Sequence, residues 1–104
     1  MAKAYEISIW EPDPGKFDEF METIKSLTKA FVEAGVTKVE LLNGVVGKDV
    51  FRVVVIQQFK GLADNGAVNE SITGHPAMKA WRDAHPGNFP AKLISHDLYQ
   101  GVDD

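Results

Sequence analysis

Residues 50–59, VFRVVVIQQF, carry the strongest structural signal in the chain. Branched aliphatic and aromatic side chains dominate this run, which is typical of a β-strand. Side chains alternate across a strand, so Val53 and Val55 point to one face while Val54 and Ile56 point to the other. Because both faces are apolar, we expect this strand to lie in the middle of a sheet.

A second strand is predicted immediately before it, over residues 36–46. The intervening residues 47–49, GKD, contain the glycine that is common in short hairpin turns. We therefore expect the two segments to form an antiparallel pair joined by a tight turn.

Two helical regions and two further strands complete the predicted set of elements. In residues 17–35, apolar side chains recur at steps of three and four, which predicts an amphipathic helix. Residues 4–11 alternate as a strand does, with Tyr5, Ile7 and Ile9 on one face and Trp10 on the other. Downstream, the pattern predicts two shorter helices and a last strand, over residues 62–73, 76–84 and 91–100.

The order strand, helix, strand, strand, helix, strand is that of a ferredoxin-like βαββαβ fold of the α+β class. This fold has a four-stranded antiparallel sheet with its helices on one face. Right-handed crossovers then place the first and third strands in the centre. Residues 1–104 are predicted to form this single domain.

The sheet face without helices is predicted to be apolar, and Trp10 is predicted to lie on it with valine and isoleucine side chains. A large uncovered apolar face marks an interface. We therefore expect a homodimer in which two sheets pack face to face about a two-fold axis. The alternative is a monomer that exposes a few valines.

The composition restricts the classes of function. The chain has 104 residues, with 11 Lys and Arg against 15 Asp and Glu, for a net charge of −4. Its basic side chains are scattered, which argues against nucleic acid and anionic membranes as partners. The absence of cysteine excludes a disulfide scaffold, a thiolate zinc site and a cysteine nucleophile. No apolar run of signal-peptide or membrane-spanning length is predicted, so we expect a cytoplasmic protein.

Three segments of the chain resemble the dimeric alpha-beta barrel superfamily: residues 13–20 (DPGKFDEF), 74–81 (GHPAMKAW) and 94–99 (ISHDLY). The likeness is to its antibiotic-biosynthesis-monooxygenase-like and stress-responsive barrel-like members. It implies a ferredoxin-like fold that closes into a barrel as a homodimer. The superfamily includes cofactor-independent and haem-degrading monooxygenases, cyclases and isomerases, so the resemblance implies a fold and not one reaction.

Two histidines are predicted as catalytic residues. His75 begins a His-Pro-x-His-like element in which Met78 replaces the second histidine, so the resemblance to cyclase-like members is incomplete. A cap on the helix that Pro76 starts is the alternative role for His75. His96 alternates with apolar residues on the last strand and suits proton transfer near neutral pH. The alternative for His96 is a buried histidine with satisfied hydrogen bonds.

Four other residues are predicted to line a ligand pocket: Trp81, Trp10, Arg52 and His85. Trp81 and His85 resemble the tryptophan and histidine of haem-degrading members, but their spacing differs and the first strand has no asparagine, so haem is not expected. Core packing is the alternative for Trp81, and an ion pair with an acid across the dimer is the alternative for Arg52. No metal is expected, because the three histidines lack the spacing of metal ligands.

The combined prediction is a small-molecule-binding protein. The resemblance implies monooxygenase-like or isomerase-like chemistry on an aromatic or polyketide-like compound, without a tightly bound cofactor. A non-catalytic ligand-binding or assembly module is the alternative.

Overall fold

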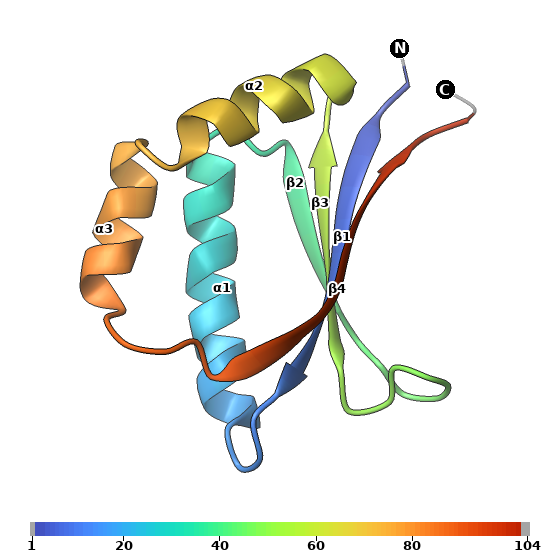
Figure 1. Ribbon diagram of the computed structural model, residues 1–104, viewed down its shortest axis with the longest axis vertical. Coiled ribbons are helices and arrows are strands. Elements are labelled where there is room, and N and C mark those ends of the chain that lie inside the picture. Colours follow the sequence, from blue (N-terminus) through green and yellow to red (C-terminus); the bar gives the residue numbers. More distant parts are fainter. Residues whose placement is uncertain (1, 103–104) are drawn as a thin grey trace.

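A computed structural model describes residues 2–102 and has two layers, a twisted four-stranded sheet and a layer of helices on one of its faces (Figure 1). The sheet is antiparallel, with the order β2-β3-β1-β4, which confirms the ferredoxin-like α+β prediction and the two central strands. The strands are β1 (Ala4–Pro12), β2 (Lys38–Asn43), β3 (Val53–Phe59) and β4 (Ala91–Gln100), and the helices are α1 (Phe17–Glu33), α2 (Leu62–Ile72) and α3 (Pro76–Ala84).

The main core lies between α1 and the two central strands, β1 and β3. Phe20 and Ile24 of α1 pack against Val53 and Val55 of β3, and all four side chains are almost fully buried. Burying a side chain of this size contributes about 1.5–3 kcal/mol to folding. The apolar stripe of α1 thus fixes that helix against β3.

The other two helices pack largely on α1 and on one end of the sheet. Val68 of α2 is buried with Phe59 of β3, and Met78 of α3 is buried with Ala30 of α1. Figure 1 shows α3 beside α1, on the side of α1 that faces away from the strands, whereas α2 crosses near one end of the sheet. The helix side of β4 therefore remains uncovered, and Leu98 on that side is 50% exposed.

The predicted hairpin between the second and third strands is wrong in its boundaries. β2 ends at Asn43 and β3 begins at Val53, so a nine-residue loop replaces the short turn. Phe51 adopts a φ of +68° in the left-handed region, which is unusual for a bulky residue and interrupts a strand. The side chain of Phe51 is 81% exposed instead of packed in the sheet.

Trp10 is not on the open face of the sheet as predicted. Its ring packs against Phe20 and Phe89, with ring centroids 6.4 and 4.9 Å apart, so it belongs to the helix side. The side chains on the open face of the two central strands are instead aliphatic. There, Ile7 pairs with Ile56 and Ile9 pairs with Val54. An alternating strand with apolar residues on both faces does not reveal which face the helices cover.

A register shift changes the predicted faces of the last strand. The pairing of β4 with β1 shifts between Ile9 and Trp10, so that Leu93 lies opposite Trp10 while His96 lies opposite Ser8. Leu93 and His96 therefore face the same side, although strict alternation had placed them on opposite sides. A bulge adds one residue to a strand and changes the alternation of side chains beyond it.

Candidate functional site

A carboxylate and an imidazole meet on the helix side of the sheet. Glu6 of β1 and His96 of β4 are brought together by strand pairing, and Nε2 of His96 lies 2.8 Å from Oε1 of Glu6. The Glu6 side chain is 14% exposed and that of His96 is 49% exposed. The predicted catalytic histidine therefore has access to solvent and also contacts a carboxylate that is largely covered by protein.

Two asparagines of α2 bind the same carboxylate. Nδ2 of Asn65 lies 2.8 Å from Oε2 of Glu6, and Nδ2 of Asn69 lies 2.9 Å from the same oxygen. The two asparagines are four residues apart and so share one face of the helix. Both oxygens of Glu6 thus accept hydrogen bonds from side chains.

The Glu6–His96 pair borders a small cavity between the sheet and α1, which we call the sheet cavity. Its volume is about 100 Å³. The polar part of the lining comes from Glu6, Ser8, Gln57 and His96, whereas the remainder is apolar. The apolar lining residues are Trp10, Ile24, Leu27, Phe31 and Val55.

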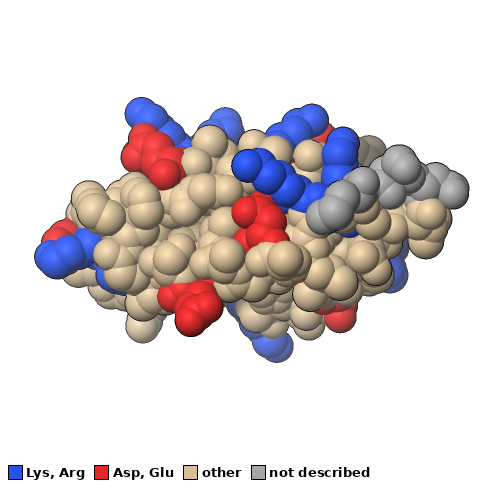
Figure 2. Space-filling view, turned by 90° about the horizontal axis from the view of Figure 1, so that it is seen from above, with Lys and Arg blue, Asp and Glu red and all other residues tan. Residues whose placement is uncertain are grey.

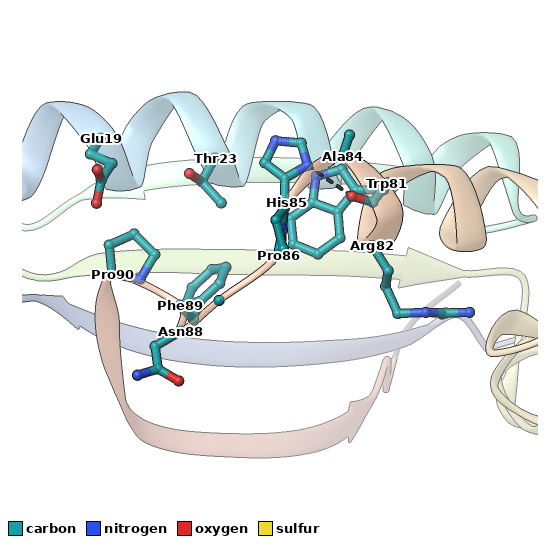
Figure 3. Close-up of a pocket in the computed structure, with 11 residues that line it drawn as sticks. Glu19, Thr23, Trp81, Arg82, Ala84, His85, Pro86, Asn88, Phe89 and Pro90 are labelled. Atoms are coloured by element: carbon teal, nitrogen blue, oxygen red, sulfur yellow. Dashed lines mark hydrogen bonds between the residues drawn. The ribbon is translucent and has the colours of Figure 1, made fainter.

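A second, larger cavity of about 630 Å³ lies between α1, the end of α3 and the loop that leads to β4. We call it the loop cavity. Figure 3 shows Trp81, His85 and Phe89 around it, with Glu19 and Thr23 of α1 facing Pro90 and Phe89. The ring of Phe89 also packs at a tilt against Trp10, which lines the sheet cavity. The aromatic pair Trp10–Phe89 therefore contributes to the walls of both cavities.

Hydrogen bonds fix the side chains of Trp81 and His85 in the loop cavity. Their rings stack with centroids 4.6 Å apart, and Nδ1 of His85 lies 2.8 Å from the carbonyl oxygen of Trp81. A carbonyl only accepts, so Nδ1 of His85 carries the proton, and Nε2 of His85 faces the hydroxyl oxygen of Ser26 at 3.4 Å. Nε1 of Trp81 donates to Oγ of Ser26 at 2.9 Å.

The six predicted site residues do not form one site. His96 and Trp10 line the sheet cavity, and Trp81 and His85 line the loop cavity. Trp81 also packs beside the buried cluster around Met78, so its predicted pocket and core roles coexist.

His75 and Arg52 lie elsewhere in the chain. His75 is the N-cap of α3, where its Nδ1 accepts a hydrogen bond from the backbone N–H of Ala77 at 3.1 Å. This contact confirms the alternative capping role of His75. Arg52 forms ion pairs with Glu11 and Asp49 of the same chain, each at 3.3 Å, which differs from the predicted pair across a dimer.

The loop around Arg52 is predicted to respond to acid. The hydrogen bond from Lys48, and then that from Arg52, lower the pKa of the Asp49 carboxyl below its usual value. A lowered pKa stabilises the fold above the pKa of an unfolded aspartate, about 3.9, and this contribution disappears as the pH falls through the folded value. We therefore expect Asp49→Asn to lower the urea midpoint slightly at pH 7 and progressively less below about pH 4. If the urea midpoints of the variant and the wild type differed as much below about pH 4 as at pH 7, the prediction would be contradicted.

The described part of the chain has few features of other functional classes. Within residues 2–102, no group of three or more His, Asp or Glu side chains could hold a metal ion, and no helix is long and apolar enough to cross a bilayer. Figure 2 shows basic and acidic side chains dispersed around the end of the molecule near α2, with broad uncharged areas between them.

Sequence patterns did not identify Glu6, Asn65, Asn69 or Phe89 as site residues. The only usable signals were a glutamate on the side of β1 that also carries Trp10, and asparagines four residues apart in a helix. Asn65 is 92% buried, which is unusual for this residue type. Burial was not evident from the sequence because α2 has almost no amphipathic pattern around these asparagines.

Comparison with known proteins supports the fold but assigns no activity to this chain. No protein-family model matches the sequence, and no curated protein is significantly similar to it. Solved structures do match over almost the whole chain. A NIPSNAP domain protein from Burkholderia xenovorans superposes with a TM-score of 0.69 and 15% identity, covering 97% of this chain and 94% of its own.

Two further structures extend this likeness. A protein from Nitrosomonas europaea, provisionally named an antibiotic biosynthesis monooxygenase, gives a TM-score of 0.62 with 19% identity, covering 96% of this chain and 90% of its own. A similarly named protein from Chloroflexus aurantiacus gives 0.65 with 12% identity, covering 98% and 95%. These superpositions show that the chain shares the ferredoxin-like fold of these structures, and at such low identities they show the fold alone.

Proposed function

We propose that this protein is an enzyme that acts on an aromatic or polyketide-like small molecule without a tightly bound cofactor, with His96 as the proton acceptor. The observation that carries the proposal is the Glu6–His96 pair at the edge of a cavity whose lining is otherwise mostly apolar. A neutral imidazole has one ring nitrogen with a lone pair that can accept a proton. Apolar surroundings strengthen the interaction of such a group with a charge that develops on the substrate.

The size of the sheet cavity limits what can enter it. At about 100 Å³ it is smaller than the cavities of about 150 Å³ that are known to take benzene. We therefore propose that the reacting end of the substrate enters the cavity. The remainder would lie along the uncovered helix side of β4, where Leu93 and Leu98 are 45% and 50% exposed.

The proposed chemistry begins with transfer of a carbon-bound proton from the substrate to His96. In isomerase-like chemistry, the same proton returns to a different carbon of the same compound. In monooxygenase-like chemistry, dioxygen is the co-reactant: a CH₂ group becomes a carbonyl, one oxygen atom enters the product, and the other leaves as water. An adjacent aromatic ring or carbonyl in the substrate delocalises the charge of the intermediate in both cases.

A panel of hydroquinones, phenols and aromatic acids, each with a CH₂ group next to its ring or to a carbonyl, tests this function. Each compound is added to the purified protein while oxygen uptake, the absorbance spectrum and the melting temperature are recorded. We expect at least one compound to be turned over and to raise the melting temperature by mass action. Binding of panel compounds without turnover of any of them would reject the enzyme in favour of the alternative below.

The loop cavity favours an alternative function, that of a non-catalytic ligand-binding module. Its volume of about 630 Å³ lies in the usual range for small-molecule sites, and Trp81, His85 and Phe89 offer aromatic contacts. Binding there requires no contact with His96.

Replacement of Trp81 distinguishes the two cavities. Because an aromatic contact contributes about 0.5–1.5 kcal/mol, Trp81→Phe should weaken a ligand of the loop cavity by about 2- to 10-fold. The matched replacement His96→Gln should leave that affinity unchanged, and isothermal titration measures both. A ligand that loses affinity with His96→Gln but not with Trp81→Phe binds in the sheet cavity instead.

We also propose that two copies of the chain associate through the open face of the sheet. Apolar side chains occupy this face on all four strands, and a shallow hollow of about 220 Å³ lies between some of them and the polar side chains of Lys38, Glu40 and Gln58. The apolar residues are Tyr5, Ile7, Ile9, Leu42, Val54, Ile56 and Tyr99. Because apolar patches of this extent are uncommon on monomers, a second sheet packed face to face accounts for them.

A further inference from the structure

The Glu6 carboxylate has no free oxygen for a substrate. Oε1 accepts from Nε2 of His96, and Oε2 accepts from the side-chain amides of Asn65 and Asn69, at distances between 2.8 and 2.9 Å. A glutamate that is only 14% exposed and bound in this way is unsuited to act as the base itself. Its contacts instead suit the role of holding another group.

We infer that Glu6, held in place by Asn65 and Asn69, is a positioning residue that fixes His96 as the Nε2–H tautomer and leaves Nδ1 as the proton-accepting atom. An ionised carboxylate can only accept hydrogen bonds, so the nitrogen that faces it must carry a proton. In a neutral imidazole the other nitrogen then has the free lone pair. The catalytic part of this inference rests on the proposed function.

The two asparagines explain why the carboxylate stays in one orientation. Nδ2 of Asn69 donates both to Glu6 and to the backbone carbonyl of Asn65, which lies 2.9 Å away. Asn65 is buried, and a buried amide is costly unless its hydrogen bonds are made. Helix α2 thus contributes to the site although it offers no group that contacts the sheet cavity.

The replacement Glu6→Gln tests the inference, because glutamine has the same shape but only one oxygen. Two asparagine donors should hold that oxygen in the position of Oε2, so the new NH₂ group takes the position of Oε1. It then donates toward Nε2 of His96, which must become the unprotonated nitrogen. We therefore expect the tautomer of His96 to reverse from Nε2–H to Nδ1–H.

Two-bond ¹H–¹⁵N correlation spectra of the ¹⁵N-labelled protein measure this tautomer without substrate, at about pH 9, where an ordinary histidine is neutral. The other histidines serve as internal references, since Nδ1 of His85 faces a carbonyl and Nδ1 of His75 faces an N–H. Glu70→Gln, an exposed replacement on α2, is the matched control and should change none of the three signals.

Either of two results would overturn the inference: a wild-type His96 in the Nδ1–H form, or an unchanged His96 tautomer in Glu6→Gln protein whose amide spectrum remains that of the folded chain. The wild-type spectrum decides the first point even if the variant does not fold. With a substrate in hand, Glu6→Gln should also reduce kcat by about 100-fold or more, since a wrong tautomer places a proton on the accepting nitrogen. An Nε2–H tautomer without any turnover would support the positioning role and reject the proposed enzyme.

Discussion

Replacing His96 with glutamine is expected to reduce turnover of the best panel compound by about 10²- to 10⁴-fold, which is the usual contribution of a positioned general base. Glutamine retains an N–H donor for the 2.8 Å contact with Glu6 but has no basic nitrogen. Because the His96 side chain is half exposed, the change leaves no cavity in the core. The loss should therefore appear in kcat, measured by oxygen uptake or product absorbance, with the melting temperature almost unchanged.

His85→Gln is the matched control for this experiment. His85 lies in the loop cavity and has no contact with the Glu6–His96 pair, so its replacement should leave kcat within about threefold of the wild-type value. If His85→Gln instead abolishes turnover while His96→Gln retains it, the reaction takes place in the loop cavity and His96 is not the base.

The replacement Val54→Lys is expected to convert the proposed dimer into a monomer. Val54 lies on β3 between Ile9 of β1 and Leu42 of β2, on the open face. In a face-to-face dimer, each copy would have to bury an ammonium group that has no acid directly opposite it. An uncompensated buried charge costs about 3–5 kcal/mol, so the dissociation constant should rise by about 100-fold or more. Sedimentation equilibrium at micromolar concentration should then report a mass near 11.4 kDa, compared with about twice that for the wild type.

Val32→Lys is the control for the effect of adding a positive charge anywhere on the surface. Val32 lies on α1, away from the open face, and is 47% exposed, so a lysine there remains solvated and should leave the mass unchanged. A wild-type mass of 11.4 kDa at micromolar concentration would show that the open face is not a dimer interface. A Val54→Lys protein that keeps the dimer mass would place the interface elsewhere.

The order and type of the elements could be predicted from local patterns. The repeat of three and four in α1 and the alternation in β1 each follow from the geometry of one segment, so no knowledge of distant residues was required. The run of aliphatic residues in β3 likewise indicated a central strand, because only a covered strand can be apolar on both faces. Pro76 correctly marked the start of α3, since proline suits the first turn of a helix.

The tertiary structure alone decided which face of each strand the helices cover and which side chains meet. Trp10 could have faced either layer, because both sides of β1 carry apolar groups, and its packing on Phe20 and Phe89 resolved the question. Glu6 meets His96 through a strand pairing that spans 90 residues of sequence, and it meets Asn69 across 63 residues. Local periodicity determines the geometry of a segment. Contacts between distant segments depend on register, bulges and helix placement, which arise only when the whole chain packs together.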